Sequence, residues 1–369
     1  MVNKAFSLSR ICRQFQLDGE FLGAAPFGEG HIHATFVTRF RQQDGTIRRY
    51  LLQHINRQVF PEPEKVMENI EHVTEHLRRK IISAGGDPLR NTINLMPARD
   101  GQSFYQSDDG EYWWAEGFIE NASSYHVASS PGQYFKAAKA FGEFQRYLAD
   151  FPVDQLHVTI PDFPHTGKRF EQFADAVKRD AVQRASEAQT EIEFAIRRVE
   201  EANHLVDLAA AGVLPERVTH NDAKLDNILM DDRSGEGICV IDLDTVMPGL
   251  AVYDFGDIVR SGANTAGEDE QNPAQVKFDL QIYEHIVHGF LEATRNSLTS
   301  SEIDQLPFAA QLITFEQGLR FLADYLNGDK YYRIHRPRHN LERCRTQFKL
   351  VSEMETKFDA MVKVKELYR

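Results

Sequence analysis

Four polar side chains near the middle of the chain have types and an order suited to one reaction. Asp222, Lys224 and Asn227 lie within a short loop, and Asp242 follows after two apolar runs. An aspartate can take the proton of an attacking hydroxyl, and a lysine beside it can meet the charge of a transferring phosphate. Amide and carboxylate oxygens are ligands that Mg²⁺ prefers. The pattern indicates phosphoryl transfer from a nucleotide, with Asp222 and Lys224 catalytic and Asn227 and Asp242 on the metal.

The elements between these residues explain how they would meet. Ile228–Met230 is an apolar run, residues 231–237 are polar with glycine, and a second apolar run leads into Asp242. This predicts a β-hairpin, and antiparallel pairing brings its two outer ends together. Asn227 and Asp242 would then reach one Mg²⁺, with Asp222 at the same edge. A His-x-Asp tripeptide or an Asp-rich turn alone is more often a solvated loop, so the hairpin carries the functional interpretation.

A second aspartate motif follows the hairpin. Asp254–Gly256 spells Asp-Phe-Gly, a magnesium-binding tripeptide, but it comes after Pro248 and Gly249 and would not sit opposite Asn227. We therefore interpret Asp242 as the metal ligand. Asp254 and Asp257 are expected to cap the next helix or to hold the catalytic loop by hydrogen bonds.

The first third of the chain is predicted to be rich in strands, with one helix between them. The helix spans Pro63 to about Ala84, where apolar residues recur every three or four positions and two glycines follow. Glu68 and Glu71 lie on it, and either one could orient phosphate-binding groups, although most such glutamates are solvated. The expected strands are Ala24–Phe27, Ala34–Phe40, Arg49–Ile55, Ser103–Tyr105 and Tyr112–Ile119.

The turn between the first two strands is a candidate phosphate-binding loop. Gly28 and Gly30 can bring backbone N–H groups close to phosphates, and His31 follows them. Two glycines would equally suit an ordinary hairpin turn. The third strand carries Gln53 where a phosphate-pairing lysine is expected, which leaves Arg57 as the nearest cation, or metal and backbone alone, to hold the triphosphate.

The last strand of this part ends where a hinge to the rest of the chain is expected. Backbone groups near Glu116 and Phe118 could meet the adenine edge, whereas at least one of Trp113 and Trp114 is expected to be core. Beyond Pro131 the pattern is helical, and one long helix is expected to end at Ala211 before the catalytic loop. The apolar periodicity covers Tyr134–Leu148, Phe170–Ala211, Phe278–Leu291, Leu312–Leu326 and Phe348–Leu367.

This order predicts a two-lobed α+β fold. Residues 1–118 would form a strand-rich nucleotide-binding lobe, and residues 119–369 a mostly helical catalytic and substrate-binding lobe. The net charge of −13 argues against nucleic acid or an acidic membrane as the main partner. No apolar run approaches a membrane span, and three widely spaced cysteines favour a reducing, cytoplasmic setting. A monomer or weak homodimer is expected.

The same motifs carry a family resemblance over nearly the whole chain. The chain resembles the superfamily of aminoglycoside phosphotransferases and choline kinases, whose fold is protein-kinase-like, and within it looks like the N-acetylhexosamine 1-kinases. The broad resemblance rests on His220–Asn227 and Asp242. The narrower resemblance rests on Gly28–Ile32, Leu52–Asn56, Val59–Phe60, Met67–Ile70, Asp242–Gly249, Tyr253–Asp257 and Arg320–Asp329.

The resemblance implies transfer of the γ-phosphate of ATP, with Mg²⁺, to the anomeric hydroxyl of N-acetylglucosamine or N-acetylgalactosamine. Asp222 would touch and deprotonate that hydroxyl. Arg320, Asp324 and Tyr325 would bind the sugar, although an ion pair and a core tyrosine would explain them equally well. The missing strand lysine would be a trait of the narrower group. Which epimer is preferred is left open.

Other functions remain open on the sequence. A choline, homoserine or aminoglycoside kinase of the same superfamily is the main alternative, and Tyr325, Tyr331 and Tyr332 could form a weak aromatic cage for a quaternary amine. A nucleotide-binding pseudokinase is the non-enzymatic alternative, which the missing lysine favours. A scaffold has no need of Asp222, Asn227 and Asp242 together, and this argues for an enzyme.

Overall fold

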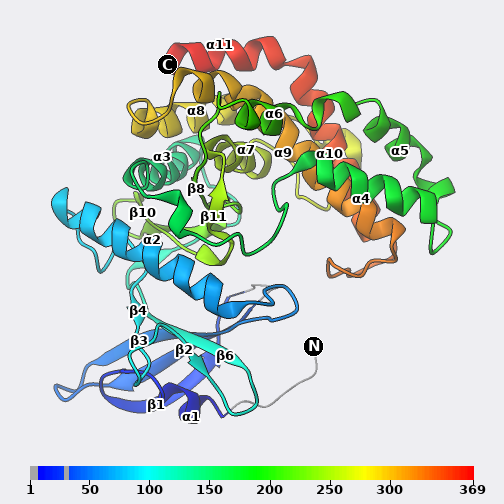
Figure 1. Ribbon diagram of the computed structural model, residues 1–369. Helices are drawn as coiled ribbons and strands as arrows, with labels where there is room; N and C mark the ends of the chain where they lie inside the picture. The colour runs from blue at the N-terminus through cyan, green and yellow to red at the C-terminus, as the bar shows by residue number, and fades with distance from the viewer. Residues whose placement is uncertain (1–6, 29–32) are drawn as a thin grey trace.

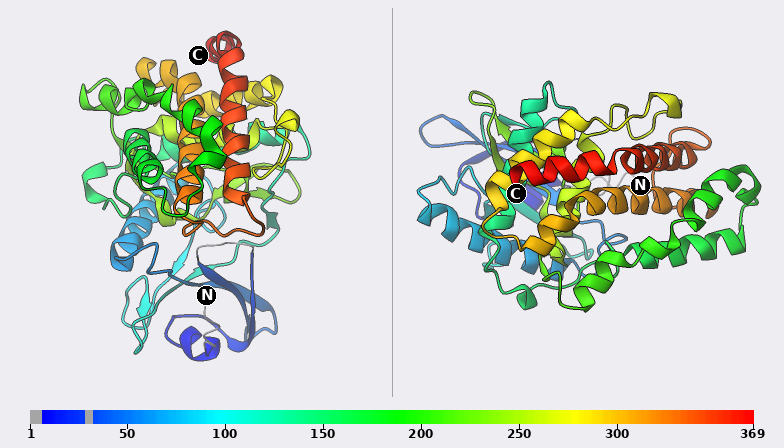
Figure 2. Two further views of the ribbon diagram at one scale, coloured as in Figure 1. Left: turned by 90° about the vertical axis from the view of Figure 1, so that its right-hand side faces the viewer. Right: turned by 90° about the horizontal axis from the view of Figure 1, so that it is seen from above.

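The computed structural model describes residues 7–28 and 33–369, arranged as two lobes (Figure 1). The sheet-containing lobe, here the N lobe, lies below, and the helical C lobe lies above it with α11 farthest from the sheet. Figure 2 shows the same stacking from the side. The predicted fold, a strand-rich first lobe followed by a helical second lobe, is confirmed. No helix in the described ranges is long and apolar enough to cross a membrane.

The N lobe is built on one antiparallel sheet with strand order β1-β2-β3-β6-β4, and β5 pairs with β6. Side chains alternate between its two faces. One face, with Tyr50, Leu52 and Trp113, packs on Phe15 in a small core beside α1 (Leu8–Cys12). The strands are β1 (Glu20–Pro26), β2 (Ala34–Arg41), β3 (Ile47–His54), β4 (Leu95–Met96), β5 (Tyr105–Gln106) and β6 (Tyr112–Gly117).

Helix α2 (Pro63–Ser83) lies between this sheet and the C lobe (Figure 1). Proline occupies its first turn, where a missing N–H costs nothing, and the chain leaves the helix at Ala84 before two glycines. The apolar positions that predicted the helix form its buried face. Trp114, on the opposite face of the sheet from Trp113, packs in the same core as these residues.

The C lobe is a set of packed helices around a small catalytic hairpin. Helix α3 crosses α8 so closely that a Cβ added at Gly289 would lie 2.1 Å from the carbonyl oxygen of Phe135. The approach therefore depends on glycine at that position. The main helices are α3 (Pro131–Tyr147), α4 (Thr166–Arg179), α7 (Ala251–Gly262), α8 (Leu280–Thr294), α9 (Ser300–Leu326), α10 (His339–Thr356) and α11 (Phe358–Tyr368).

The predicted long helix before the catalytic loop is wrong. The chain from 166 to 210 forms α4, α5 (Gln189–Ile196) and α6 (His204–Ala210), with 3₁₀ turns between them. Asp180 ends α4 in a left-handed conformation, φ +38°, and Gln183 has φ +58°. Apolar residues keep a helical spacing through these breaks, which is why the pattern concealed them.

The hairpin itself is confirmed. Strand β9 (Ile228–Asp231) pairs antiparallel with β10 (Gly237–Val240), and Ile228 lies opposite Val240. Strand β7 (Ala122–Ser123) pairs with the outer side of β9, so the chain just past the hinge already belongs to the C-lobe sheet. A second pair, β8 (Arg217–Thr219) with β11 (Met247–Gly249), frames the segment in which the candidate catalytic residues lie.

Candidate active site

Asp254, in the first turn of α7, holds the backbone of the candidate catalytic loop, residues 220–227. Its two carboxylate oxygens accept the backbone N–H groups of His220 (2.9 Å) and Asn221 (2.8 Å), and Gln145 donates a third hydrogen bond (2.5 Å). Asp254 is fully buried, and burial raises the pKa of its carboxyl, although the amide donors oppose the shift. These contacts bear out the expectation that Asp254 holds the loop by hydrogen bonds.

The loop brings three of the predicted residues into direct contact. The Asn227 amide nitrogen donates to the carbonyl oxygen of Asp222 (2.8 Å) and to its Oδ2 (2.9 Å). Lys224 Nζ lies 3.0 Å from the same Oδ2. Burial alone would raise the pKa of Asp222, but the charge of Lys224 and its hydrogen bond outweigh it and hold the pKa below its usual range. Asp222 is therefore ionised, and half-buried in reach of a ligand.

Asp242 joins this group at the end of the second hairpin strand. The amide of Ile241 donates to the Asn227 carbonyl (3.0 Å), which sets Asp242 next to Asn227, and Asp242 itself has φ +63°. Asp242 is exposed to solvent. The surrounding protein, and the charges of Asp244 and Asp222, raise the pKa of Asp242.

These residues fit a hard divalent cation. Carboxylates gathered at one point repel each other, and a cation bound between them removes the repulsion. Asn227 uses its amide nitrogen on Asp222, so its oxygen remains as an acceptor. Across the described ranges no group of three or more His, Cys, Asp or Glu side chains forms a metal cage. The carboxylate of Asp242 and the free amide oxygen of Asn227 are of the type that would hold such a cation.

On the nucleotide side, the structure locates some of the predicted residues and not others. Gly28 has φ +74°, a conformation that favours glycine, while Gly30 and His31 lie outside the described residues. Gln53 lies between β2 and β6, where its Oε1 accepts a hydrogen bond from Thr35 (3.2 Å). Arg57 lies over the ring of Tyr112, at the far end of β6 from the hinge.

The hinge residues have separate roles. The Phe118 N–H donates to the Arg49 carbonyl (3.3 Å), so this amide is already used by the sheet. The ring of Phe118 lies under the Arg49 guanidinium and against Phe27. Glu116 is buried on the sheet face that also carries Gln53 and Trp114, and burial raises the pKa of its carboxyl to about 7.

Of the two glutamates proposed on α2, Glu68 has its side chain turned to the C lobe. Glu68 contacts His157 of the C lobe, with Oε2 and Nε2 2.6 Å apart. Its neighbour Asn69 is the residue that the sequence reasoning passed over: it is buried and donates to the carbonyls of His157 (2.8 Å) and Val246 (2.9 Å). The sequence signal for Asn69 was a polar residue on the apolar face of an amphipathic helix.

Of the three residues proposed to bind the acceptor, Arg320 has different contacts from Asp324 and Tyr325. Its guanidinium lies 5.1 Å from the ring centre of Phe163 and 5.7 Å from that of Tyr332; we call these three residues the acceptor wall. Asp222 and Arg320 both lie near enough to Arg260 for its charge to act on them.

Asp324 and Tyr325 are engaged elsewhere. The Asp324 oxygens accept the backbone N–H groups of Lys330, Tyr331 and Tyr332, each at 2.9 Å. Tyr325 is fully buried, and its hydroxyl donates to Glu187 (3.2 Å). Asp324 therefore holds the loop that places Tyr332 in the acceptor wall.

A further buried pair supports the site and was not foreseen as a pair. Asp257 lies 2.7 Å from Nε of Arg260, whose Nη1 lies 3.1 Å from Glu268. Burial alone would lower the pKa of Arg260, but the two carboxylates raise it, so it is a permanent cation near Asp222.

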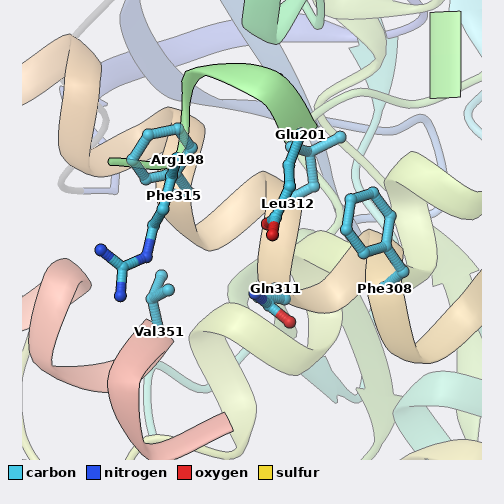
Figure 3. A pocket seen from close by; sticks show the side chains of 7 residues that line it. All are labelled: Arg198, Glu201, Phe308, Gln311, Leu312, Phe315 and Val351. Atoms are coloured by element: carbon cyan, nitrogen blue, oxygen red, sulfur yellow. The ribbon is translucent and has the colours of Figure 1, made fainter. Parts of the chain in front are cut away.

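Two hollows in the C lobe are unrelated to this chemistry. One lies between α9, α10 and the turn Val199–Glu201 (Figure 3). Its volume of about 10 Å³ holds no more than one water molecule. The other, of about 400 Å³, is lined by α5 and α10 around Phe194 and Phe348. Neither is lined by a residue of the catalytic loop.

Comparison with solved structures finds the same fold. An aminoglycoside phosphotransferase from Alicyclobacillus acidocaldarius matches with TM-score 0.60 and 10% identity, covering 98% of this chain and 97% of that one. A microcompartment-associated aminopropanol kinase matches with TM-score 0.57 and 13% identity, covering 96% and 98%. Amicoumacin kinase hAmiN, in complex with AMP-PNP, Ca²⁺ and its ligand Ami, matches with TM-score 0.57 and 11% identity, covering 95% and 92%.

A family model described as "Phosphotransferase enzyme family" (APH) matches residues 26–287, which include β2, β3 and β6 of the N lobe and the candidate catalytic residues from Asp222 to Asp242. The chain therefore belongs to the APH phosphotransferase enzyme family.

Proposed function

We propose that this kinase transfers the γ-phosphoryl group of ATP to the anomeric hydroxyl of an N-acetylhexosamine, N-acetylglucosamine or N-acetylgalactosamine. The observation that carries the choice of acceptor is the acceptor wall. The Arg320 guanidinium lies over two aromatic rings, and one of its five N–H groups donates to Gln317 (3.0 Å). The remaining donors need acceptor oxygens, such as those of sugar hydroxyls or an N-acetyl carbonyl.

The same wall argues against a quaternary amine. A choline-type cation is recognised over aromatic faces, and here Arg320 already lies over the ring of Tyr332. Burial alone would lower the pKa of Arg320, but its neighbours Tyr332, Tyr331 and Glu316 raise it. Arg320 therefore keeps its positive charge and repels a second cation. An amino alcohol or aminoglycoside acceptor would have to place its ammonium group away from this wall.

In the proposed reaction Asp222 orients the acceptor hydroxyl and takes its proton as the oxygen attacks the γ-phosphorus. The bond from that phosphorus to the β-phosphate oxygen breaks, and ADP leaves. Lys224 lies beside Asp222 and can meet the charge of the transferring group. Mg²⁺, held by Asn227 and Asp242, would neutralise charge on the phosphates. The described residues supply no strand lysine here, since position 53 is Gln53.

The test measures ADP release from ATP in the presence of each of a panel of acceptors. N-acetylglucosamine, N-acetylgalactosamine, glucose, galactose, choline, aminopropanol, homoserine and an aminoglycoside are each assayed with Mg²⁺. We expect preference for the two N-acetyl sugars, loss of turnover in Asp222→Asn, and a product phosphate that is labile to acid and stable to alkali. Turnover supported only by an amine would overturn the sugar assignment and leave the kinase family intact.

A variant of the acceptor wall sharpens this test. Arg320→Gln removes a charged donor worth about 1.5–3 kcal/mol, so the KM for the N-acetyl sugar should rise by about tenfold or more, with the KM for ATP unchanged. Arg179→Gln is the control, because Arg179 lies on neighbouring α4 and contacts Asn327 on the surface. Equal KM values for the sugar in Arg320→Gln and the parent chain would exclude Arg320 from acceptor binding.

A further inference from the structure

A buried histidine of the N lobe meets an aspartate next to the metal-binding position of the C lobe. His33 directly precedes β2, and its Nε2 lies 2.9 Å from Oδ2 of Asp244. Both side chains are 5% exposed. Asp244 lies in the turn Leu243–Thr245, two residues after Asp242.

The imidazole of His33 is held in one orientation. Its ring stacks on Phe60 at 5.3 Å with 28° between the planes, and meets Trp114 edge-on, also at 5.3 Å. Its Nδ1 accepts the backbone N–H of Asn56 (3.1 Å). Because Nδ1 accepts, the ring proton is placed on Nε2, which faces Asp244. Nε2 of His33 and Oδ2 of Asp244 lie 2.9 Å apart but are not aligned as a hydrogen bond, so the contact is an electrostatic attraction between the polar N–H group and the carboxylate.

The turn that carries Asp244 is tied on its other sides to both lobes. The Thr245 hydroxyl donates to the His220 carbonyl (2.7 Å), and the Asn221 amide donates to the Thr245 carbonyl (3.0 Å). Asn69 of α2 holds the Val246 carbonyl. These contacts fix the backbone of the turn, but none of them holds the Asp244 carboxylate.

That carboxylate needs to be held. Asp244 follows Asp242 by two residues in the same turn, and a free Asp244 side chain would compete for the cation that Asp242 is placed to bind. We infer that His33 is a positioning residue: it holds Asp244 toward the N lobe and so leaves Asp242 as the oxygen ligand at the phosphates. The inference rests on the proposed metal role of Asp242.

The contact also couples the two lobes. His33 lies directly before β2 of the N lobe, and Asp244 on the C-lobe turn that would hold the metal. Replacing a residue that supports a metal site without touching the metal commonly changes metal affinity by about 10–100-fold. His33 should therefore affect how much the metal adds to nucleotide binding, rather than nucleotide binding itself.

The experiment measures ADP binding to the full chain by calorimetry, with Mg²⁺ and with EDTA. In the parent chain Mg²⁺ should strengthen ADP binding. In His33→Phe, which keeps an aromatic ring on Phe60, we expect this gain to fall by about tenfold, with binding in EDTA changed by less than about twofold. His33→Gln keeps a side-chain donor and should recover most of the gain. The kcat of His33→Phe should fall and the KM for the acceptor should stay the same.

A second histidine provides the matched control. His76 of α2 also reaches the C lobe, where its Nε2 lies 3.1 Å from Oδ1 of Asp150, away from the metal-binding turn. His76→Gln should lower the thermal midpoint without changing the Mg²⁺-dependent gain. The pair His33→Phe and Asp244→Asn should be non-additive in that gain when combined.

Three results would overturn the inference. The first is a His33→Phe chain with a lowered thermal midpoint and an unchanged Mg²⁺-dependent gain, which would make His33 a packing residue. The second is the same loss of ADP affinity in EDTA and in Mg²⁺. The third is a parent chain in which Mg²⁺ adds nothing to ADP binding, and this result alone would remove the proposed metal site as well.

Discussion

Removal of the Asp254 carboxylate is expected to release the catalytic loop. In the folded chain this buried side chain accepts the amides of His220 (2.9 Å) and Asn221 (2.8 Å). Alanine leaves both buried N–H groups without an acceptor, at a cost of about 1–3 kcal/mol each. Asp254→Ala should therefore reduce the free energy of unfolding by about 2–6 kcal/mol. Because the loop carries Asp222, kcat should fall more than the affinity for nucleotide.

Urea unfolding followed by circular dichroism measures the first quantity, and steady-state ADP release measures the second. Asp254→Asn keeps one acceptor oxygen and should show a smaller loss of stability. Asp44→Ala is the matched control, since Asp44 accepts the amide and hydroxyl of Thr46 on an exposed turn. An Asp254→Ala chain with the stability and kcat of the parent would refute the idea that this carboxylate holds the loop.

Two further predictions concern packing and pH. Gly289→Ala should destabilise the chain by about 1–3 kcal/mol or more, because the new Cβ meets the Phe135 carbonyl oxygen at 2.1 Å. Gly132→Ala, whose Cβ would meet only Ser130 Oγ at 4.0 Å, should be neutral or stabilising in the same thermal melts. Burial raises the pKa of Glu116 to about 7 from 4.5, so its contribution to stability is full below pH 4.5 and is lost as pH rises through about 7. Glu116→Gln should remove that loss, about 3 kcal/mol at pH 8, in urea unfolding compared at pH 5 and pH 8; equal pH dependence in both chains would contradict it.

The sequence predicted best where local pattern and tertiary structure agree. The hairpin between Asn227 and Asp242 follows from two apolar runs and a polar turn, and it places both residues as expected. Helix α2 begins at Pro63 as predicted and ends at Ser83, within one residue of the predicted end. Helix α9 was predicted only from Leu312, because Pro307 breaks the pattern, yet the capping box of Thr299 and Glu302 starts the helix at Ser300.

The remainder depended on contacts between distant residues, which spacing does not encode. His33 meets Asp244 across the lobes, and Asn69 meets the Val246 carbonyl. Arg320 and Asp324 are four residues apart on one helix, yet one reaches the acceptor wall and the other binds the backbone of its own loop. Helical spacing predicts which residues share a face, but not which partners that face will meet.

The catalytic loop and the acceptor wall are held by different elements, and this affects how the range of acceptors could change in evolution. The catalytic loop is anchored by Gln145 of α3 and Asp254 of α7. The acceptor wall is built from α9, the segment before α4 and the loop that Asp324 holds. Substitutions that reshape the wall therefore leave the anchors of Asp222 untouched. Evolution could exchange one small-molecule acceptor for another in such a chain while phosphoryl transfer continues unchanged.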